Sequence, residues 1–166
     1  MAEKNKEIKE QTVIAEEVPD EEMNKVIRHH VYVSMAVGLI PIPVADFAGV
    51  TVIQLNMLRV IAKKYGVPFS KSMVKNILSS LVGGAVPATA SAPLAASLSK
   101  LIPGIGTTAG IVTMPIVSGA STYAVGKVFI QHFASGGTFL TFKPEKVRAY
   151  YEEMLKEGKK VASAKA

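Results

Sequence analysis

The sequence predicts an all-α protein, a bundle of about five helices that associates with a membrane through a small-residue-rich, proline-kinked central helical hairpin. Strand signals are poor, whereas apolar residues recur at helical spacing along most of the chain. In addition, residues 76–99 and 101–126 contain no formally charged side chain. A surface of that composition needs lipid or another subunit to cover it.

Apolar spacing and helix-breaking residues set the boundaries of the first three helices. The first helix is expected over 20–40, because acidic residues suit its first turn and Pro41 and Pro43 stop it. The second is expected over about 44–65, ending at Gly66. Ser70 is placed to cap a third helix, which we expect to bend or break near two further prolines, Pro87 and Pro93.

The remaining helices follow a proline-glycine turn at 101–106. A fourth helix is expected from that turn to Gly136, and an amphipathic fifth over 144–157. The chain is thus divided into a charged N-terminal tail (1–18), a helical domain (19–137) with an apolar hairpin (77–126), and a C-terminal helix with a basic tail (138–166). Residues 159–166 are expected to be solvated or ordered by a partner.

Charge and composition favour a membrane surface. Charged residues make up 19% of the chain against roughly 25% in typical soluble domains, and the net charge is +6. Five basic residues precede the apolar hairpin, and we expect them to bind anionic lipid: Arg59, Lys63, Lys64, Lys71 and Lys75. The positive-inside rule then places both termini in the cytoplasm, at the cytoplasmic membrane. The alternative location is the cytoplasm itself.

Small residues at four-residue spacing predict helices that pack closely. They include Gly106 and Gly110, and the series Ser118, Thr122 and Gly126. This pattern predicts a homo-oligomer.

Asp46 is the single formally charged residue between Arg28 and Arg59. Because it follows Pro43 closely, its carboxylate can meet free backbone N–H groups in the first turn of a helix. Pairing with a basic residue of a neighbouring helix or subunit is a second interpretation. Metal binding or proton transfer is a third.

The segment 38–66, with Pro41, Pro43, Asp46, Gln54 and Gly66, together with "KLIPGIG" and "VGKVFIQHFASGG" downstream, resembles the YcjF-type domain of unknown function. This bacterial domain often lies C-terminal to small GTPase domains. The resemblance covers about residues 25–137 and implies an α-helical, membrane-associated domain that works beside a GTPase. Because the chain has no phosphate-binding loop of the GxxxxGK[ST] type, that GTPase would be another polypeptide.

No residue pattern predicts catalysis, a metal site or a cofactor. The chain has no cysteine, which excludes thiolate zinc sites and cysteine nucleophiles. His29 and His30 point about 100° apart on a helix, and we expect His30 on the apolar face. Gln54 and Asn56 are expected to bond to neighbouring helices. Nucleic acid is not expected as a partner, because glutamates interrupt the basic C-terminal segment.

These features predict a non-enzymatic, membrane-associated scaffold that self-assembles through small-residue helices. The alternative is a soluble helical adaptor that forms a homo-oligomeric ring, shell or filament. A third interpretation is a pore lined by small polar residues of the apolar hairpin.

Overall fold

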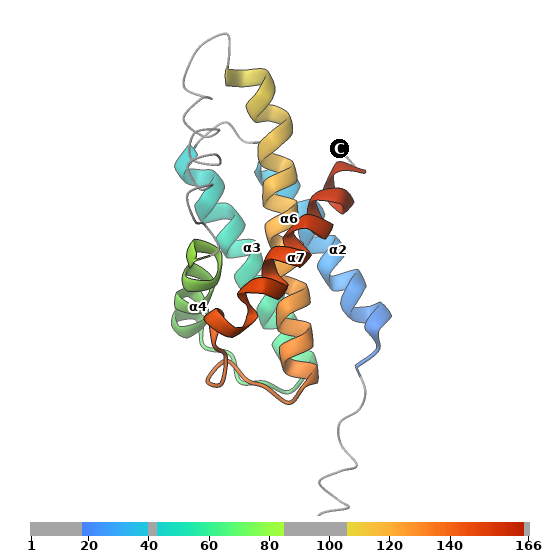
Figure 1. Cartoon of the computed structure of the whole chain (residues 1–166), viewed down its shortest axis with the longest axis vertical. Helices are drawn as coiled ribbons and strands as arrows, with labels where there is room; N and C mark the ends of the chain where they lie inside the picture. Colours follow the sequence, from blue (N-terminus) through green and yellow to red (C-terminus); the bar gives the residue numbers. More distant parts are fainter. Residues whose placement is uncertain (1–17, 40–42, 85–105, 165–166) are drawn as a thin grey trace, which may run out of the picture.

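The structure, a computed structural model, describes residues 18–39, 43–84 and 106–164, without the side chains of 43–47, 83–84 and 106–113. Within this part the chain forms five helices and no strand (Figure 1). They are α2 (Asp20–Val37), α3 (Pro43–Lys64), α4 (Lys71–Gly84), α6 (Gly106–Ala134) and α7 (Pro144–Ser163). The all-α prediction is confirmed, and the predicted starts of all five helices agree with the structure to within a few residues.

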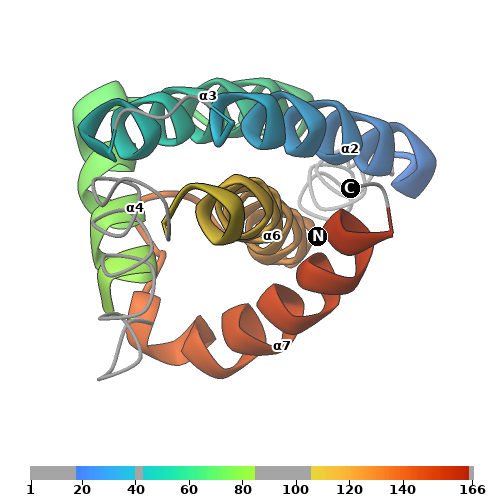
Figure 2. The same cartoon turned by 90° about the horizontal axis from the view of Figure 1, so that it is seen from above.

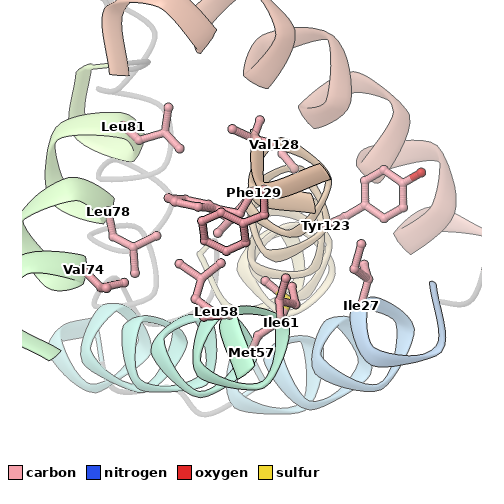
Figure 3. Packing of buried hydrophobic residues seen from close by; sticks show 14 of the residues in the cluster. Ile27, Met57, Leu58, Ile61, Val74, Leu78, Leu81, Tyr123, Val128 and Phe129 are labelled. Atoms are coloured by element: carbon pink, nitrogen blue, oxygen red, sulfur yellow. The ribbon is translucent and has the colours of Figure 1, made fainter. Parts of the chain in front are cut away.

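Helix α6 is the central element of the bundle. Seen along its axis, α2 and α3 form a layer on one side of α6, and α4 and α7 lie around its other sides (Figure 2). Buried residues occur on every face of the second half of α6: Ala120, Tyr123, Ala124, Val125, Val128, Phe129 and Phe133. A helix that is apolar all round is a core helix. The hydrophobic core is therefore built around α6, with Phe129 near its middle (Figure 3).

Helices α2 and α6 pack closely because α6 presents small residues to α2. A Cβ atom added at Gly126 would lie 2.8 Å from Ile27 Cγ1, and one added at Gly119 would lie 2.7 Å from Met35 Cγ. At the end of α2, a Cβ on Gly38 would lie 3.0 Å from the backbone of Pro115. The order of these contacts along the two helices shows that α2 and α6 run antiparallel. The small residues predicted to allow close helix approach do so here within a single chain.

Helix α7 crosses α6 at one point where the two backbones approach each other. A Cβ added at Gly158 would lie 2.8 Å from the carbonyl oxygen of Ala120 and 3.0 Å from its Cα. One turn later, Ala162 is buried, with its Cβ 3.4 Å from the position that a Cβ on Gly119 would take. The expected end of this helix at 157 is therefore wrong: α7 continues to Ser163, because Val161 and Ala162 pack on the body.

At the opposite end of α6, aromatic rings join the two loops of the bundle. Phe129 stacks on Phe142, with ring centroids 4.5 Å apart, and Phe69 meets Phe139 edge to face at 5.9 Å. This cluster holds the α3–α4 loop against the α6–α7 loop. The glycines that end α3 and α6, Gly66 and Gly136, have φ of 66° and 78°, which is the conformation that terminates a helix. The expected bend near Pro87 and Pro93 lies outside the described residues.

We expect Gly158→Ala to destabilise the protein by about 1–3 kcal/mol, because the methyl group must push α7 away from the backbone of α6. At a helical position without such a contact, glycine to alanine would instead stabilise by about 1 kcal/mol. The sign of the change in free energy of unfolding, measured by denaturant titration, decides between them. Glu153→Ala, at an exposed position of the same helix, is the matched control and should change stability little. A Gly158→Ala protein as stable as the parent would contradict this packing.

Candidate functional site

Formal charge is unevenly distributed along the axis of the bundle. One end, here called the apolar end, comprises residues 29–37 of α2 with the following 38–39, residues 43–58 of α3 and residues 106–126 of α6. Asp46 is the single formally charged residue in these ranges. The three segments lie together at one end of the molecule, where α6 extends beyond the C-terminus of α7 (Figure 1). Segments that are separate in the sequence thus form one continuous region with a single formal charge.

Large apolar side chains are exposed on the outward face of the α2–α3 layer in this region. The exposed fractions are 57% for Leu39, 63% for Val52, 45% for Tyr32 and 38% for Val33. No described helix covers this face (Figure 2). Exposed apolar residues that gather in one place mark a surface that contacts a membrane or another protein.

The five basic residues that the sequence singled out gather at the opposite end, here called the basic end. It comprises the end of α3 with Arg59, Lys63 and Lys64, and the start of α4 with Lys71 and Lys75. Lys64 donates a hydrogen bond to Glu22 of α2, and the Arg59 guanidinium lies 6.0 Å from the centre of the Phe69 ring. Among the described residues, Lys64 forms an ion pair, and the side chains of the other four basic residues form none.

A chain of buried and partly buried hydrogen bonds joins four helices within the apolar end. The Ser34 and Thr122 hydroxyl groups are 2.8 Å apart. Gln54 donates to Ser121 Oγ at 3.1 Å and to Thr122 Oγ1 at 3.4 Å, and Ser121 Oγ lies 3.2 Å from the Tyr151 hydroxyl. Satisfied polar groups in a core fix the register of the helices that carry them.

The expectation for Gln54 is therefore confirmed: it bonds to a neighbouring helix. The other members of this network, Ser34, Ser121 and Tyr151, were not recognised in the sequence. Serines spaced on the buried face of a predicted helix could have indicated them, but their partners are at least 30 residues away in the chain.

The remaining predicted site residues are only partly described. Pro41 lies outside the described residues. Pro43 begins α3, Asp46 falls in its first turn, and Gly106 begins α6 with Gly110 one turn later. The side chains of Pro43 and Asp46 are not described, so the three interpretations of Asp46 stay predictions.

His30 is buried between α2 and α3, in agreement with its predicted position on the apolar face of its helix. Its Nδ1 is 2.8 Å from the Val26 carbonyl oxygen and must donate to it. Its Nε2 is then free to accept from Asn56 Nδ2 at 3.2 Å, as the prediction for Asn56 requires. Burial lowers the pKa of His30 below 6.5, the nearby His29 lowers it further, and the Val26 hydrogen bond partly opposes them. The imidazole is therefore neutral in the folded state near pH 7.

No candidate metal site is formed by the described histidines and carboxylates. A surface depression of about 320 Å³ lies between α6 and α7, lined by His132, Gln131, Lys146 and Tyr150 among others. His132 is already engaged there, because its Nε2 lies 2.9 Å from the Thr138 carbonyl oxygen and must donate to it. Ser135 also lines the depression, and its hydroxyl donates to the Gln131 carbonyl oxygen at 2.8 Å.

The described helices contain no segment with both the length and the apolar character needed to cross a membrane. The expected hairpin across a membrane over 77–126 is therefore not found among them, and residues 85–105 lie outside the description.

Lowering the pH from 7.5 to 5.5 should reduce the free energy of unfolding. The unfolded chain takes up a proton on His30 near pH 6.5, whereas the folded chain resists this until its lower pKa is reached, so stability is lost below about pH 6.5. Denaturant titrations at several pH values measure the slope. The slope should be reduced more in His30→Gln than in His29→Gln, which removes only the smaller contribution of His29 to the pKa of His30. An unchanged slope in His30→Gln would contradict the assigned neutral imidazole.

Comparison with known proteins agrees with the resemblance inferred from the sequence. A family model described as "Domain of unknown function (DUF697)" matches residues 3–160. A curated relative, Magnetosome membrane protein 22 of Magnetospirillum gryphiswaldense, is 39% identical over 137 residues, which are 82% of this chain and 70% of that protein. No solved structure matches the chain. The chain belongs to the DUF697 family, and the resemblance to a YcjF-type domain of unknown function is thereby confirmed.

Proposed function

We propose that the protein is a non-enzymatic, membrane-associated scaffold whose apolar end enters one leaflet of a bilayer. The observation that carries this proposal is the separation of charge along the bundle, with a single formal charge in the apolar end and exposed Leu39 and Val52 on its surface. Lipid covers such a surface without a partner protein.

The dimensions of the apolar end agree with insertion into one leaflet. Beyond the C-terminus of α7, residues 106–120 of α6 rise about 22 Å at 1.5 Å per residue, and residues 43–53 of α3, which precede the level of Gln54 and Ser121, rise about 16 Å. Half of a bilayer, including its headgroups, measures roughly 20–22 Å. The apolar end can therefore reach the middle of a membrane without crossing it.

The relative from Magnetospirillum supports the same proposal, because its name describes it as a membrane protein. At 39% identity the two chains share a fold, and we extend the membrane association to this chain. We place the protein at the cytoplasmic membrane with both termini in the cytoplasm. A GTPase partner from another polypeptide remains part of the proposal and follows from the family resemblance.

Self-assembly into a homo-oligomer is the second element of the proposal. Gly119 and Gly126 already pack against α2 within the chain. Contacts between copies must therefore use other surfaces, and Gly106 and Gly110 at the start of α6 are the candidates. The mass of the complex, extracted with its native lipids, tests this element.

The alternative is a soluble helical adaptor, in which further copies of the chain cover the apolar end. Tyr32 and Val33 are exposed on the outward face of α2. Another copy of the chain would cover them as well as lipid does, so their exposure agrees with both functions. Size measurement in buffer without detergent distinguishes the two. A large, lipid-free particle supports the adaptor, whereas sedimentation with membranes that resist salt and alkaline washing supports the scaffold.

The double substitution Leu39→Glu with Val52→Glu should abolish flotation of the purified protein with phospholipid vesicles, because two carboxylates would have to enter the hydrocarbon. Both side chains are exposed, so the fold should survive, which circular dichroism verifies. Leu140→Glu is the matched control: Leu140 is 80% exposed, but it lies in the α6–α7 loop at the opposite end. Equal flotation of the double variant and the parent would exclude the apolar end as the membrane contact.

A further inference from the structure

The last turns of α7 bring two lysines alongside the apolar end, at the border of the part that α7 leaves uncovered. Gly158 touches Ala120 of α6 and Ala162 lies next to Gly119, so Lys159 and Lys160 are level with residues 119–120 of α6. Both side chains are exposed. On α2, α3 and α6, the charged residues other than Asp46 lie further toward the basic end than this level.

Tyr32 lies at a similar height on a different side of α6. Ser34, half a turn along α2, bonds to Thr122, which places Tyr32 just beyond Thr122 toward the basic end. Figure 2 shows α2 and α7 on different sides of α6. Tyrosine and lysine are the side chains that most often mark the border between hydrocarbon and water, because each combines an apolar stem with a polar tip.

From this arrangement we infer that Lys159 and Lys160 bind the anionic headgroups of the leaflet that the apolar end enters, with Tyr32 at the same membrane–water border. The inference rests on the proposed function and specifies its lipid contact. The lysines are available for this contact, because neither forms an ion pair among the described residues. The nearest carboxylate in the chain, that of Glu157, accepts a hydrogen bond from the Tyr123 hydroxyl at 2.6 Å.

The basic end is too far away to bind the same headgroups. Gln54 is level with Ser121 and Thr122, and Lys63 follows nine residues later on α3, which is about 14 Å along the axis. Lys71 and Lys75 follow the loop beyond Lys63. On this inference the α7 pair holds the lipid in place of Arg59, Lys63, Lys64, Lys71 and Lys75, and the basic end faces away from the bilayer.

The test compares two matched pairs of neutralised lysines, Lys159→Gln with Lys160→Gln and Lys71→Gln with Lys75→Gln. Binding is measured by flotation with vesicles of zwitterionic lipid alone and of zwitterionic lipid with 30% anionic lipid as a chosen, roughly physiological condition. The α7 pair should weaken binding to the anionic vesicles roughly ten- to thirty-fold and leave binding to the zwitterionic vesicles unchanged. The α4 pair should bind both as the parent does.

Three results would overturn the inference: a loss confined to the α4 pair, equal losses in both pairs, or no loss in either. Each would place the headgroup contact elsewhere or make it a general effect of net charge. In all three, the parent protein still floats with zwitterionic vesicles, so the proposed function survives. If the parent protein binds no vesicles of either kind, the proposed function itself fails, and the inference fails with it.

Discussion

The structure depends on the need to cover α6, a helix that carries no formal charge between residues 106 and 126. Such a helix cannot face water on any side, so its neighbours must enclose it. Helix α2 approaches it at Gly119 and Gly126, and α7 approaches it at Gly158. The chain places small residues where two backbones meet, and the buried hydroxyl and amide groups of Ser34, Gln54 and Thr122 then fix the register.

Enclosing α6 in this way sorts the remaining charges. Helices α2 and α3 run antiparallel, so the uncharged end of α2 lies beside the start of α3, where Asp46 is the single formal charge. The basic end of α3 lies beside the acidic start of α2, where Lys64 bonds to Glu22. Because α7 ends level with residue 119, it covers the second half of α6 and leaves the first half, at the apolar end, without this cover. The same packing that satisfies the core therefore leaves one end of the molecule apolar and the other polar.

Much of this could be predicted from the sequence. Helical spacing, prolines and glycines located the helices, the charge gap identified the part of the chain that needs covering, and the positions of Gln54 and His30 on buried faces were correct. The rest depends on which helices are neighbours in space. The continuation of α7 to Ser163 requires the contact between Ala162 and Gly119, which lie 43 residues apart in the numbering of the chain. The basic residues between 59 and 75 precede the apolar hairpin in the sequence, but the fold places them at the end of the bundle opposite the start of α6.

The central claim, that the apolar end lies in the membrane and the basic end in water, is tested most directly by measuring depth. The chain contains no cysteine, so a fluorescent label can be attached at a single introduced position. Leu39→Cys and Lys63→Cys, both exposed, report on the two ends. With vesicles that carry a quencher on the acyl chains, the label at position 39 should be quenched strongly and the label at position 63 should not. Equal quenching at the two positions, or quenching at 63 alone, would contradict the account.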